Sequence, residues 1–497
     1  MKITASKLYD FLQCNHKVWR DAHGPQAEKN LETNPFVQLL WDKGVFHEKE
    51  VIKQIGQFSD LSVGSLEERF KKTIEEMKKG TPLIYQGVIQ YDNLLGIPDL
   101  LRRKDDSAYI PIDIKSGRGY EGVDDNNEGE FEKLKKHYAV QLCLYQEILQ
   151  RLGFSKKNEG IIYDIDNKEV FYDLSQQVGV RNKQLWTDFY HDVKEEVEEL
   201  LNNSKQNKPA VGGKCKLCPW YLSCKKWAKE THDLTNLFYV GKSDRDTINK
   251  DLNIEKIEEI EKINIDEVMK IKKSNKEYMK NLAEKKLTKI KQRAIIMDKN
   301  QKPVIYGEVN LPKTSYELFF DIEDDPTQGF IYLHGVYERS PRGERFVPFL
   351  AKNLSKEDEK EAWKNFFDYL KSLPSDDYAL YYYSHHEKTS YKKLQQQYPE
   401  VISEEDLLKI FENKNSVDLY SVIYKQTDWP LTSYSLKDIA TYLGFKWRDE
   451  TPSGALSIQW YNEYLKTKDE KIMNRILEYN EDDCKATMVM KDFLSKI

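Results

Sequence analysis

The segment Tyr109–Gly117, YIPIDIKSG, combines the apolar pattern of a buried strand with a carboxylate and an ammonium group. Successive side chains of a strand alternate between its faces, so the three isoleucines share one face and Asp113 and Lys115 share the other. Upstream, Asp99 in LLGIPDLLRR lies on a neighbouring predicted strand. A hairpin through the turn KDDSA would bring these three polar side chains to one edge of a sheet.

This group of charges suits phosphodiester hydrolysis. Carboxylates beside a lysine are costly in a protein interior unless a divalent cation is present, because an unpaired buried charge carries a large penalty. Mg²⁺ or Mn²⁺ takes oxygen ligands, lowers the pKa of bound water and stabilises charge on a phosphoryl group. The lysine can orient the nucleophile or stabilise the transition state. A structural salt bridge between Asp113 and Lys115 is the alternative interpretation.

A second group of acidic residues lies near the C-terminus. LFFDIEDDP places Asp321 and Glu323 on one face of a predicted strand, where two carboxylates do not sit close together without a cation. EYNEDDCKAT places Tyr479 and Asp483 four residues apart, on one face of a predicted helix. The same logic therefore predicts a second metal-dependent centre.

Three cysteines form the pattern C-x₂-C-x₅-C at Cys215, Cys218 and Cys224, and Cys14 lies near the start of the chain. Three thiols in one turn indicate a metal site, and in a reducing compartment clustered thiols favour a metal over a disulfide. The spacing alone leaves zinc and an iron–sulfur cluster equally open. The two other cysteines fall inside predicted helices and are expected to be buried thiols.

The elements that must position these residues fall into three regions, as a length of 497 residues leads us to expect. Residues 1–230 are predicted to form an α/β domain that ends in the cysteine-rich turn. Residues 231–311 are predicted to form a small helical connector followed by a basic helix, in a lysine-rich stretch with apolar residues at helical intervals from Val268 to Leu282. We expect its lysines to form a solvated face, with phosphate contact as the alternative. Residues 312–497 are predicted to form a second α/β domain, which makes the fold class α/β multidomain.

Composition limits the partners. Charged residues make up 32% of the chain and the net charge is −6, so phosphate binding must come from local patches. No apolar run approaches the roughly 18 residues that a membrane span needs, and the N-terminus lacks the pattern of a secretory signal. We therefore expect a cytoplasmic protein with no membrane partner.

GVFHE, GIPD, DIK and QLCLY occur in an order and spacing that resemble the RecB-like branch of the PD-(D/E)XK nucleases. The resemblance implies a restriction-endonuclease-like fold for residues 1–230. It also implies three kinds of role: metal binding by His47, Asp99 and Asp113, action on the attacking water by Lys115, and support of the site or the nucleic acid by Gln141 and Tyr145.

The cysteines resemble those of CRISPR-associated and AddB-type nucleases, in which one N-terminal and three C-terminal cysteines hold a [4Fe–4S] cluster. The resemblance implies that Cys14, Cys215, Cys218 and Cys224 hold such a cluster, with Zn²⁺ as the alternative. The cluster would join the two ends of the domain.

The C-terminal residues resemble the DEDD exonucleases of the RNase H-like, DnaQ-type superfamily, in the Tyr-x₃-Asp (DEDDy) subclass. The resemblance implies that Asp321, Glu323 and Asp483 bind two metal ions and that Tyr479 orients the attacking water.

The fourth carboxylate of that family is less clearly matched. Glu387, in YYYSHHEKTS, follows the second predicted strand where the family usually has an aspartate, and it is our choice as the remaining metal ligand. Asp418 is the competing candidate, although it could also be a helix cap. This departure leaves the activity of the C-terminal centre open.

The whole chain resembles two-domain prokaryotic RecB-like nucleases with a YprB-type RNase H-like domain at the C-terminus. The connector resembles a degenerate helix-hairpin-helix, which implies non-specific binding to a phosphate backbone. We predict a metal-dependent nuclease with Mg²⁺ or Mn²⁺ at two hydrolytic centres, acting on DNA ends or single strands in repair or defence. The alternatives are a DNA-binding scaffold that recruits a helicase, with one or both centres inactive, and a ribonuclease that acts through the C-terminal domain.

Overall fold

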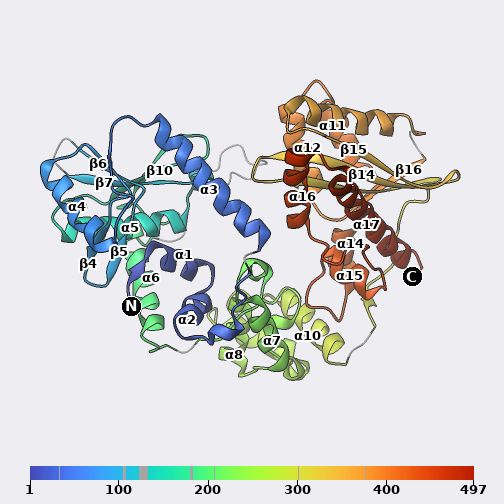
Figure 1. The fold of residues 1–497 in the computed structure, drawn as a ribbon. Coiled ribbons are helices and arrows are strands. Elements are labelled where there is room, and N and C mark those ends of the chain that lie inside the picture. The colour runs from blue at the N-terminus through green and yellow to red at the C-terminus, as the bar shows by residue number, and fades with distance from the viewer. Residues whose placement is uncertain are drawn as a thin grey trace. The chain divides into compact units, whose positions relative to one another are not determined.

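The computed structural model describes residues 1–32, 34–104, 108–121, 133–179, 183–205, 207–299, 302–374 and 377–496 (Figure 1). The chain forms two compact units. The first comprises Met1–Thr33 and Val37–Cys224, and the second comprises Asn34–Phe36 and Lys225–Ile497. The predicted connector and the predicted C-terminal α/β domain thus belong to one compact unit, and the division into three regions stays a prediction.

The first unit is built around a six-stranded sheet of order β11-β10-β7-β6-β3-β2. β6 and β7 pair in antiparallel fashion, which confirms the predicted hairpin, although its turn at 105–107 lies outside the described residues. The strands of this unit are β1 (Ile3–Thr4), β2 (Ser59–Asp60), β3 (Leu83–Tyr85), β4 (Ile89–Tyr91), β5 (Leu94–Gly96), β6 (Leu100–Arg103), β7 (Tyr109–Ile114), β8 (Tyr120–Glu121), β9 (Lys133–Leu134), β10 (Glu159–Tyr163) and β11 (Glu169–Asp173).

Helices cover both faces of this sheet. The isoleucines of β7 pack in one apolar cluster with Val51 of α3, whereas Tyr109 packs in another cluster with residues of α5. The alternation predicted for β7 is therefore confirmed, and Asp113 shares the α5 face. Figure 1 shows α5 lying along the sheet beside β7 and β10. The helices are α1 (Ala5–Gln13), α2 (Asn15–His23), α3 (Pro35–Gln54), α4 (Leu66–Lys79), α5 (Lys136–Arg151), α6 (Trp186–Leu201) and α7 (Tyr221–Glu230), which crosses the boundary between the units.

The second unit contains a five-stranded sheet of order β15-β14-β13-β16-β17. β13, β14 and β15 are antiparallel, and β16 and β17 continue the sheet in parallel with β13. The strands are β12 (Val304–Ile305), β13 (Tyr316–Asp325), β14 (Phe330–Ser340), β15 (Gly343–Leu350), β16 (Tyr378–Tyr382), β17 (Ser416–Asp418) and β18 (Thr427–Asp428).

The two faces of this sheet carry different helices. Leu318 and Phe320 pack in a cluster with residues of α11, while Phe319 packs in a cluster with residues of α17 (Figure 1). Since strand side chains alternate, Asp321 and Glu323 share the α17 face, as the sequence predicted. The helices are α8 (Lys242–Leu252), α9 (Ile265–Ser274), α10 (Glu284–Asp298), α11 (Lys356–Lys371), α12 (His386–Gln397), α13 (Glu404–Glu412), α14 (Leu419–Gln426), α15 (Leu436–Tyr442), α16 (Gly454–Thr467) and α17 (Glu470–Leu494).

The helix predicted in the lysine-rich stretch of the connector is interrupted. The apolar spacing from Val268 to Leu282 does not form a continuous helix, because α9 ends at Ser274 and the chain then turns through positive φ angles at Met279 and Asn281. The helical spacing of apolar residues does not reveal this break, because residues on both sides of the turn pack into the core at the same spacing.

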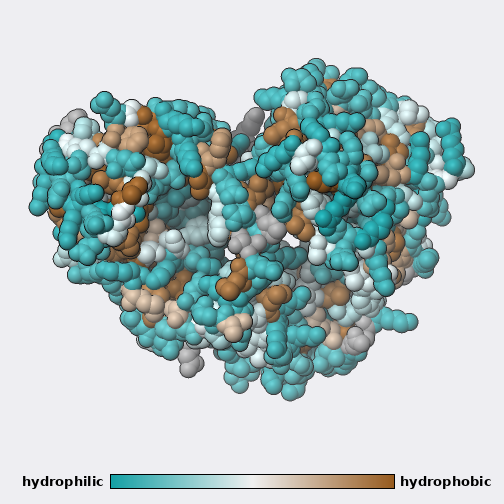
Figure 2. Space-filling model, in the orientation of Figure 1, coloured by the Kyte–Doolittle hydropathy of each residue, from teal (hydrophilic) through white to brown (hydrophobic). Residues whose placement is uncertain are grey.

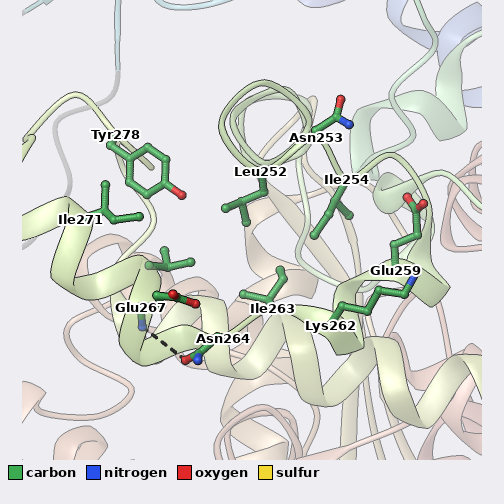
Figure 3. Close-up of a pocket in the computed structure, with 11 residues that line it drawn as sticks. Leu252, Asn253, Ile254, Glu259, Lys262, Ile263, Asn264, Glu267, Ile271 and Tyr278 are labelled. Carbon is green, nitrogen blue, oxygen red and sulfur yellow. Dashed lines mark hydrogen bonds between the residues drawn. The ribbon is translucent and has the colours of Figure 1, made fainter.

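A cavity of about 430 Å³ opens between the short helices of the connector. Figure 3 shows Leu252, Ile263 and Ile271 around it, with the ring of Tyr278 at one side. None of the predicted site residues lines this cavity, so it is separate from the carboxylate and thiol groups.

A buried ion pair fastens α10 to the strand β18. Asp428, which has no exposed surface, accepts hydrogen bonds from Arg293 Nε at 2.7 Å, Lys289 Nζ at 3.2 Å and the hydroxyl of Tyr306 at 2.9 Å. The prediction that the lysines of this helix form a merely solvated face is therefore wrong for Lys289, and Arg293 beside it is buried as well. Their charges join the connector to the C-terminal α/β part of the same unit.

Replacing Asp428 with alanine should destabilise the second unit by about 3–5 kcal/mol, because the buried guanidinium of Arg293 would lose its counter-charge. Urea unfolding followed by tryptophan fluorescence measures this change. The exposed pair of Glu405 and Lys409 offers a control, since Glu405→Ala should leave the unfolding free energy close to that of the wild type. Equal unfolding midpoints for Asp428→Ala and wild type would contradict the structural role of the pair.

Candidate active site

Three carboxylates converge on the α17 face of the five-stranded sheet. Ligand oxygen atoms of Asp321 and Glu323, from β13, and of Asp483, from α17, all lie within 4.8 Å of one another. Across the part of the chain that the structure describes, this is the one set of three or more acidic, histidine or cysteine side chains with ligand atoms this close. An all-oxygen donor set fits Mg²⁺ or Mn²⁺.

The pKa values of these carboxyl groups reflect their crowding. Burial, followed by the charge of Asp483, raises the pKa of Glu323 to about 8. Burial and the charges of Asp483 and Glu323 raise the pKa of Asp321 well above its ordinary value. The ionised set is therefore unfavourable in the metal-free protein, and a bound cation would relieve the repulsion.

Asn480, which the sequence analysis did not single out, fixes two of the carboxylates. Its Nδ2 donates to Asp321 Oδ2 at 2.8 Å and to Glu323 Oε1 at 3.3 Å. Its Oδ1 lies against Gly335 of β14, where an added Cβ would come within 1.6 Å of that oxygen. Glycine at 335 thus leaves the room that the Asn480 side chain occupies. The sequence feature that could have pointed to Asn480 is its position directly after Tyr479.

The hydroxyl of Tyr479 joins Asp483 to a lysine. It donates a hydrogen bond to Asp483 and accepts one from Lys437 Nζ at 2.7 Å. Trp447 Nε1 donates to Asp483 Oδ1 at 2.6 Å, so that carboxylate is held from two sides. Lys437 and Trp447 were missed because they reach α17 from a preceding helix and loop, and no spacing in the sequence connects them to Asp483.

Glu387 lies at the start of α12 and is buried. Burial raises its pKa to about 7, and its charge contributes to the raised pKa of Asp321, which places it beside the set. Asp418 caps α14 by accepting from the backbone amide of Ser421 at 3.1 Å, which confirms the helix-cap interpretation. Its charge also acts on Glu387. Glu387 is not part of the set whose ligand atoms lie within 4.8 Å of one another in the described residues, so its role as the fourth ligand stays a prediction.

Asp99, Asp113 and Lys115 lie together at one end of β6 and β7, the two central strands of the six-stranded sheet of the first unit. Lys115 Nζ is 2.9 Å from Asp113 Oδ2, and the backbone amide of Asp99 donates to Asp113 Oδ1 at 3.3 Å. Asp99 Oδ2 accepts from the backbone amide of Ile114 at 2.7 Å. The predicted convergence is present, and so is the ion pair of the structural alternative.

The pKa values of Asp99 and Lys115 are both raised, which favours the neutral form of the carboxyl group and the charged form of the lysine. Burial, followed by the charge of Asp113, raises the pKa of Asp99 to about 8. Burial alone would lower the pKa of Lys115, but the charges of Asp113 and Asp99 outweigh it and raise that pKa. Lys115 is therefore a firmly protonated cation beside two carboxyl groups, suited to stabilising negative charge.

Two predicted supporting residues, Gln141 and Tyr145, lie on α5, which packs against β7. Gln141 Nε2 donates to the hydroxyl of Tyr145 at 2.9 Å. Burial and then the charge of Asp113 raise the pKa of Tyr145 well above its ordinary value. An added Cβ at Gly96 would come within 2.6 Å of the Tyr145 ring, so glycine at that position lets the ring lie on β5.

His47 lies apart from the ligand arrangement that was predicted for it. Its Nε2 is 3.1 Å from the backbone oxygen of Asp164. Within the described ranges, His47, Asp99 and Asp113 are not among the sets whose ligand atoms come within 4.8 Å of one another. A role for His47 as a metal ligand therefore stays a prediction.

Glu48, the next residue of α3, faces Asp99 instead. Gln86 Nε2 donates to Glu48 Oε1 and to Asp99 Oδ1, both at 2.9 Å, and the hydroxyl of Tyr85 donates to the same Glu48 oxygen at 2.9 Å. Gln86 adopts a positive φ of 53°, an uncommon conformation for a residue other than glycine. The sequence analysis did not identify Glu48, although Glu48 directly follows His47 in the same helix.

The four cysteines lie in segments from the two ends of the first unit. Cys14 joins α1 to α2, Cys215 and Cys218 lie in the turn before α7, and Cys224 lies in α7. Burial raises the pKa of Cys224 to about 12, and the other three thiols add to this rise. The turn is held to the N-terminal helices where Trp220 Nε1 donates to Asp21 Oδ1 at 2.9 Å. The sulfur atoms of these cysteines are not among the sets whose ligand atoms lie within 4.8 Å of one another in the described residues, so a shared zinc ion or iron–sulfur cluster stays a prediction.

Residues 318–495 match a protein-family model described as the RNase H superfamily. The match runs from β13 into the end of α17 and includes every residue of the C-terminal carboxylate site. The C-terminal part of this mixed α/β, multidomain chain is therefore an RNase H-like domain, as predicted, and members of that superfamily are typically nucleases that use divalent metals.

The other comparisons give no relative. No curated protein and no solved structure shows significant similarity to the chain. The PD-(D/E)XK assignment of the first unit and its iron–sulfur cluster stay predictions. In the described ranges, no helix combines the length and the apolar character needed to cross a membrane.

Raising the pH should lower the thermal stability of the metal-free protein, and Mn²⁺ should restore it. The pKa values of Glu323, about 8, and Glu387, about 7, lie above their ordinary value of 4.5. The folded state therefore binds more protons than the unfolded state, so this stability is present below about pH 4.5 and is lost as the pH rises through 7 to 8.

Differential scanning fluorimetry tests this dependence. Saturating Mn²⁺ should raise the melting temperature by several degrees at about pH 8 and by little at about pH 5.5, where protons compete for the ligands. The variant Glu323→Gln should lose most of the gain at the higher pH. Equal gains at both pH values would contradict the assignment.

Proposed function

We propose that this protein is a divalent-metal-dependent nuclease with two hydrolytic centres, acting on the ends or single strands of DNA. The observation that carries the proposal is the convergence of Asp321, Glu323 and Asp483 within 4.8 Å inside a domain of the RNase H superfamily. Three close carboxylates with raised pKa values, two of them buried and Asp321 partly buried, are costly to the fold, and a metal-dependent reaction gives a reason for their proximity.

The C-terminal centre would bind metal through those three carboxylates and Glu387. When bound, Mg²⁺ or Mn²⁺ supplies Lewis-acid activation of water and of the phosphoryl group. The chain's own residues prepare the site. Asn480 orients two carboxylates, and Trp447 and Tyr479 hold Asp483. The Tyr479 hydroxyl would orient the attacking water. This arrangement supports an exonuclease of the Tyr-x₃-Asp subclass.

The N-terminal centre would use Asp99 and Asp113 as ligands and Lys115 as the cation beside the attacking water. The ion pair of Lys115 and Asp113 at 2.9 Å supports this proposal, because the lysine charge is already held at the carboxylate pair. Gln141 and Tyr145 would position the site or the nucleic acid. Glu48 adds a carboxylate that the family resemblance does not assign, beside Asp99.

The four thiols would hold a [4Fe–4S] cluster that closes the first unit. Cys14 precedes the six-stranded sheet in the chain and the other three cysteines follow it. A group bound by all four would therefore join the two ends of the unit and need take no part in hydrolysis.

Cleavage assays on two single variants and their matched controls test the two centres. Lys115→Ala and Asp321→Ala should each abolish one activity and lower its rate by at least about 10²-fold, since each removes a group worth several kcal/mol at the reacting phosphate. Lys71→Ala and Glu405→Ala, which alter exposed ion pairs, should cut like wild type.

The substrates are end-labelled single- and double-stranded DNA and RNA, with Mn²⁺ or with a chelator. Loss of all cutting in Asp321→Ala and none in Lys115→Ala would leave one active centre. Cleavage of RNA alone would favour a ribonuclease, and binding by the wild type without cleavage would favour a scaffold.

Anaerobic purification with iron and sulfide analysis tests the cluster. The wild type should contain iron and show an absorbance shoulder near roughly 400 nm. Cys218→Ser should lose both, whereas Cys143→Ala, at a buried thiol of α5, should retain them. Stoichiometric zinc without iron would replace the cluster with a zinc site, and the absence of both metals would remove the thiol site altogether.

A further inference from the structure

We propose that Lys437 is a positioning residue that fixes the Tyr479 hydroxyl for the attacking water. The proposal rests on the proposed nuclease function of the C-terminal centre. Neither the sequence pattern nor the family resemblance gives Lys437 a role.

The fold aims Lys437 at α17. It is the second residue of α15, whose N-terminus is fixed by Ser435, because the Ser435 side chain accepts from the backbone amide of Asp438. Ile439 and Ala440 are fully buried, so the helix is anchored in the apolar core beside α17. Lys437 Nζ then reaches the Tyr479 hydroxyl at 2.7 Å.

The number of hydrogen bonds that the Tyr479 hydroxyl can form determines the role of Lys437. A phenol has one proton and two lone pairs. The proton is donated to Asp483, and one lone pair accepts from Lys437, which can only donate. A single acceptor position remains. A water molecule that donates to that position has its oxygen lone pairs directed away from the tyrosine, which is the orientation an attacking water needs.

The charge of Lys437 also reaches the whole carboxylate set. The positive charge of Lys437 acts on Asp321, Glu323 and Asp483. Arg448, a neighbouring cation, is instead paired with Asp482 and Glu481 on the next part of α17. Removing the ammonium group would therefore remove a repulsion felt by an incoming metal ion.

The effects on kcat and on metal binding distinguish a positioning residue from a residue that only supports the fold. If Lys437 acts through the Tyr479 hydroxyl, its loss should lower kcat and leave KM and metal binding intact. If it only supports the fold, its loss should weaken Mn²⁺ binding and lower the melting temperature.

A double-mutant cycle on the full-length protein tests this, with Lys115→Ala present throughout so that only the C-terminal centre contributes. Lys437→Met and Tyr479→Phe should each lower kcat on single-stranded DNA by about 10–100-fold. The double variant should be no slower than the slower single variant, because both remove the same interaction. Lys437→Arg should recover part of the activity, and Lys466→Met, at an exposed position of α16, should match the parent.

Mn²⁺ titration by calorimetry gives a readout independent of turnover, and Lys437→Met should bind Mn²⁺ as tightly as the parent or more tightly. Losses in kcat that multiply fully in the double variant would overturn the proposal, and so would wild-type activity or weakened Mn²⁺ binding in Lys437→Met. Asp321→Ala separates the two levels of inference. Undiminished cleavage by that variant would overturn the proposed function itself, whereas its inactivity beside a fully active Lys437→Met would overturn only the role of the lysine.

Discussion

Repulsion between buried carboxylates is the constraint on which both candidate centres depend. In each unit, a side-chain amide nitrogen lies between two acidic groups and reduces this repulsion. Asn480 bridges Asp321 and Glu323, and Gln86 bridges Glu48 and Asp99. An amide donates hydrogen bonds but carries no net charge, so it offsets only part of the repulsion, and the carboxyl groups keep raised pKa values. A divalent cation supplies the charge that the amide lacks.

Rigid elements hold the groups together against this repulsion. In the second unit, β13 lies in the middle of its sheet and presents Asp321 and Glu323 on one face, where α17 packs. Gly335 on the adjoining strand gives the Asn480 side chain its space. In the first unit, β6 and β7 pair directly, so Asp99 and Asp113 are brought together by backbone register. Sites built on paired strands and packed helices keep their geometry better than sites on loops.

The connector shows how charge serves structure in the same chain. Arg293 and Lys289 lie on a lysine-rich helix that composition alone would assign to a solvated surface. Asp428 is fully buried and would be strongly unfavourable without them. The ion pair therefore ties the connector to the RNase H-like domain, so that α10 and β18 belong to one compact unit.

The sequence by itself determined the strand faces that carry Asp113, Asp321 and Glu323, the helix face shared by Tyr479 and Asp483, and the hairpin that pairs Asp99 with Asp113. These follow from local periodicity, since alternation along a strand and the turn of a helix act over a few residues. The RNase H-like domain could be recognised from the same short motifs.

Only the tertiary structure decided which side chains complete each centre. Lys437, Trp447 and Gln86 reach their carboxylates from separate elements, and His47 meets a backbone oxygen while its neighbour Glu48 turns towards Asp99. The outcome depends on how helices and loops far apart in the chain pack on the sheets. The spacing of residues in the sequence does not predict that packing. The direction of each side chain is fixed by contacts that form only when the distant segments meet.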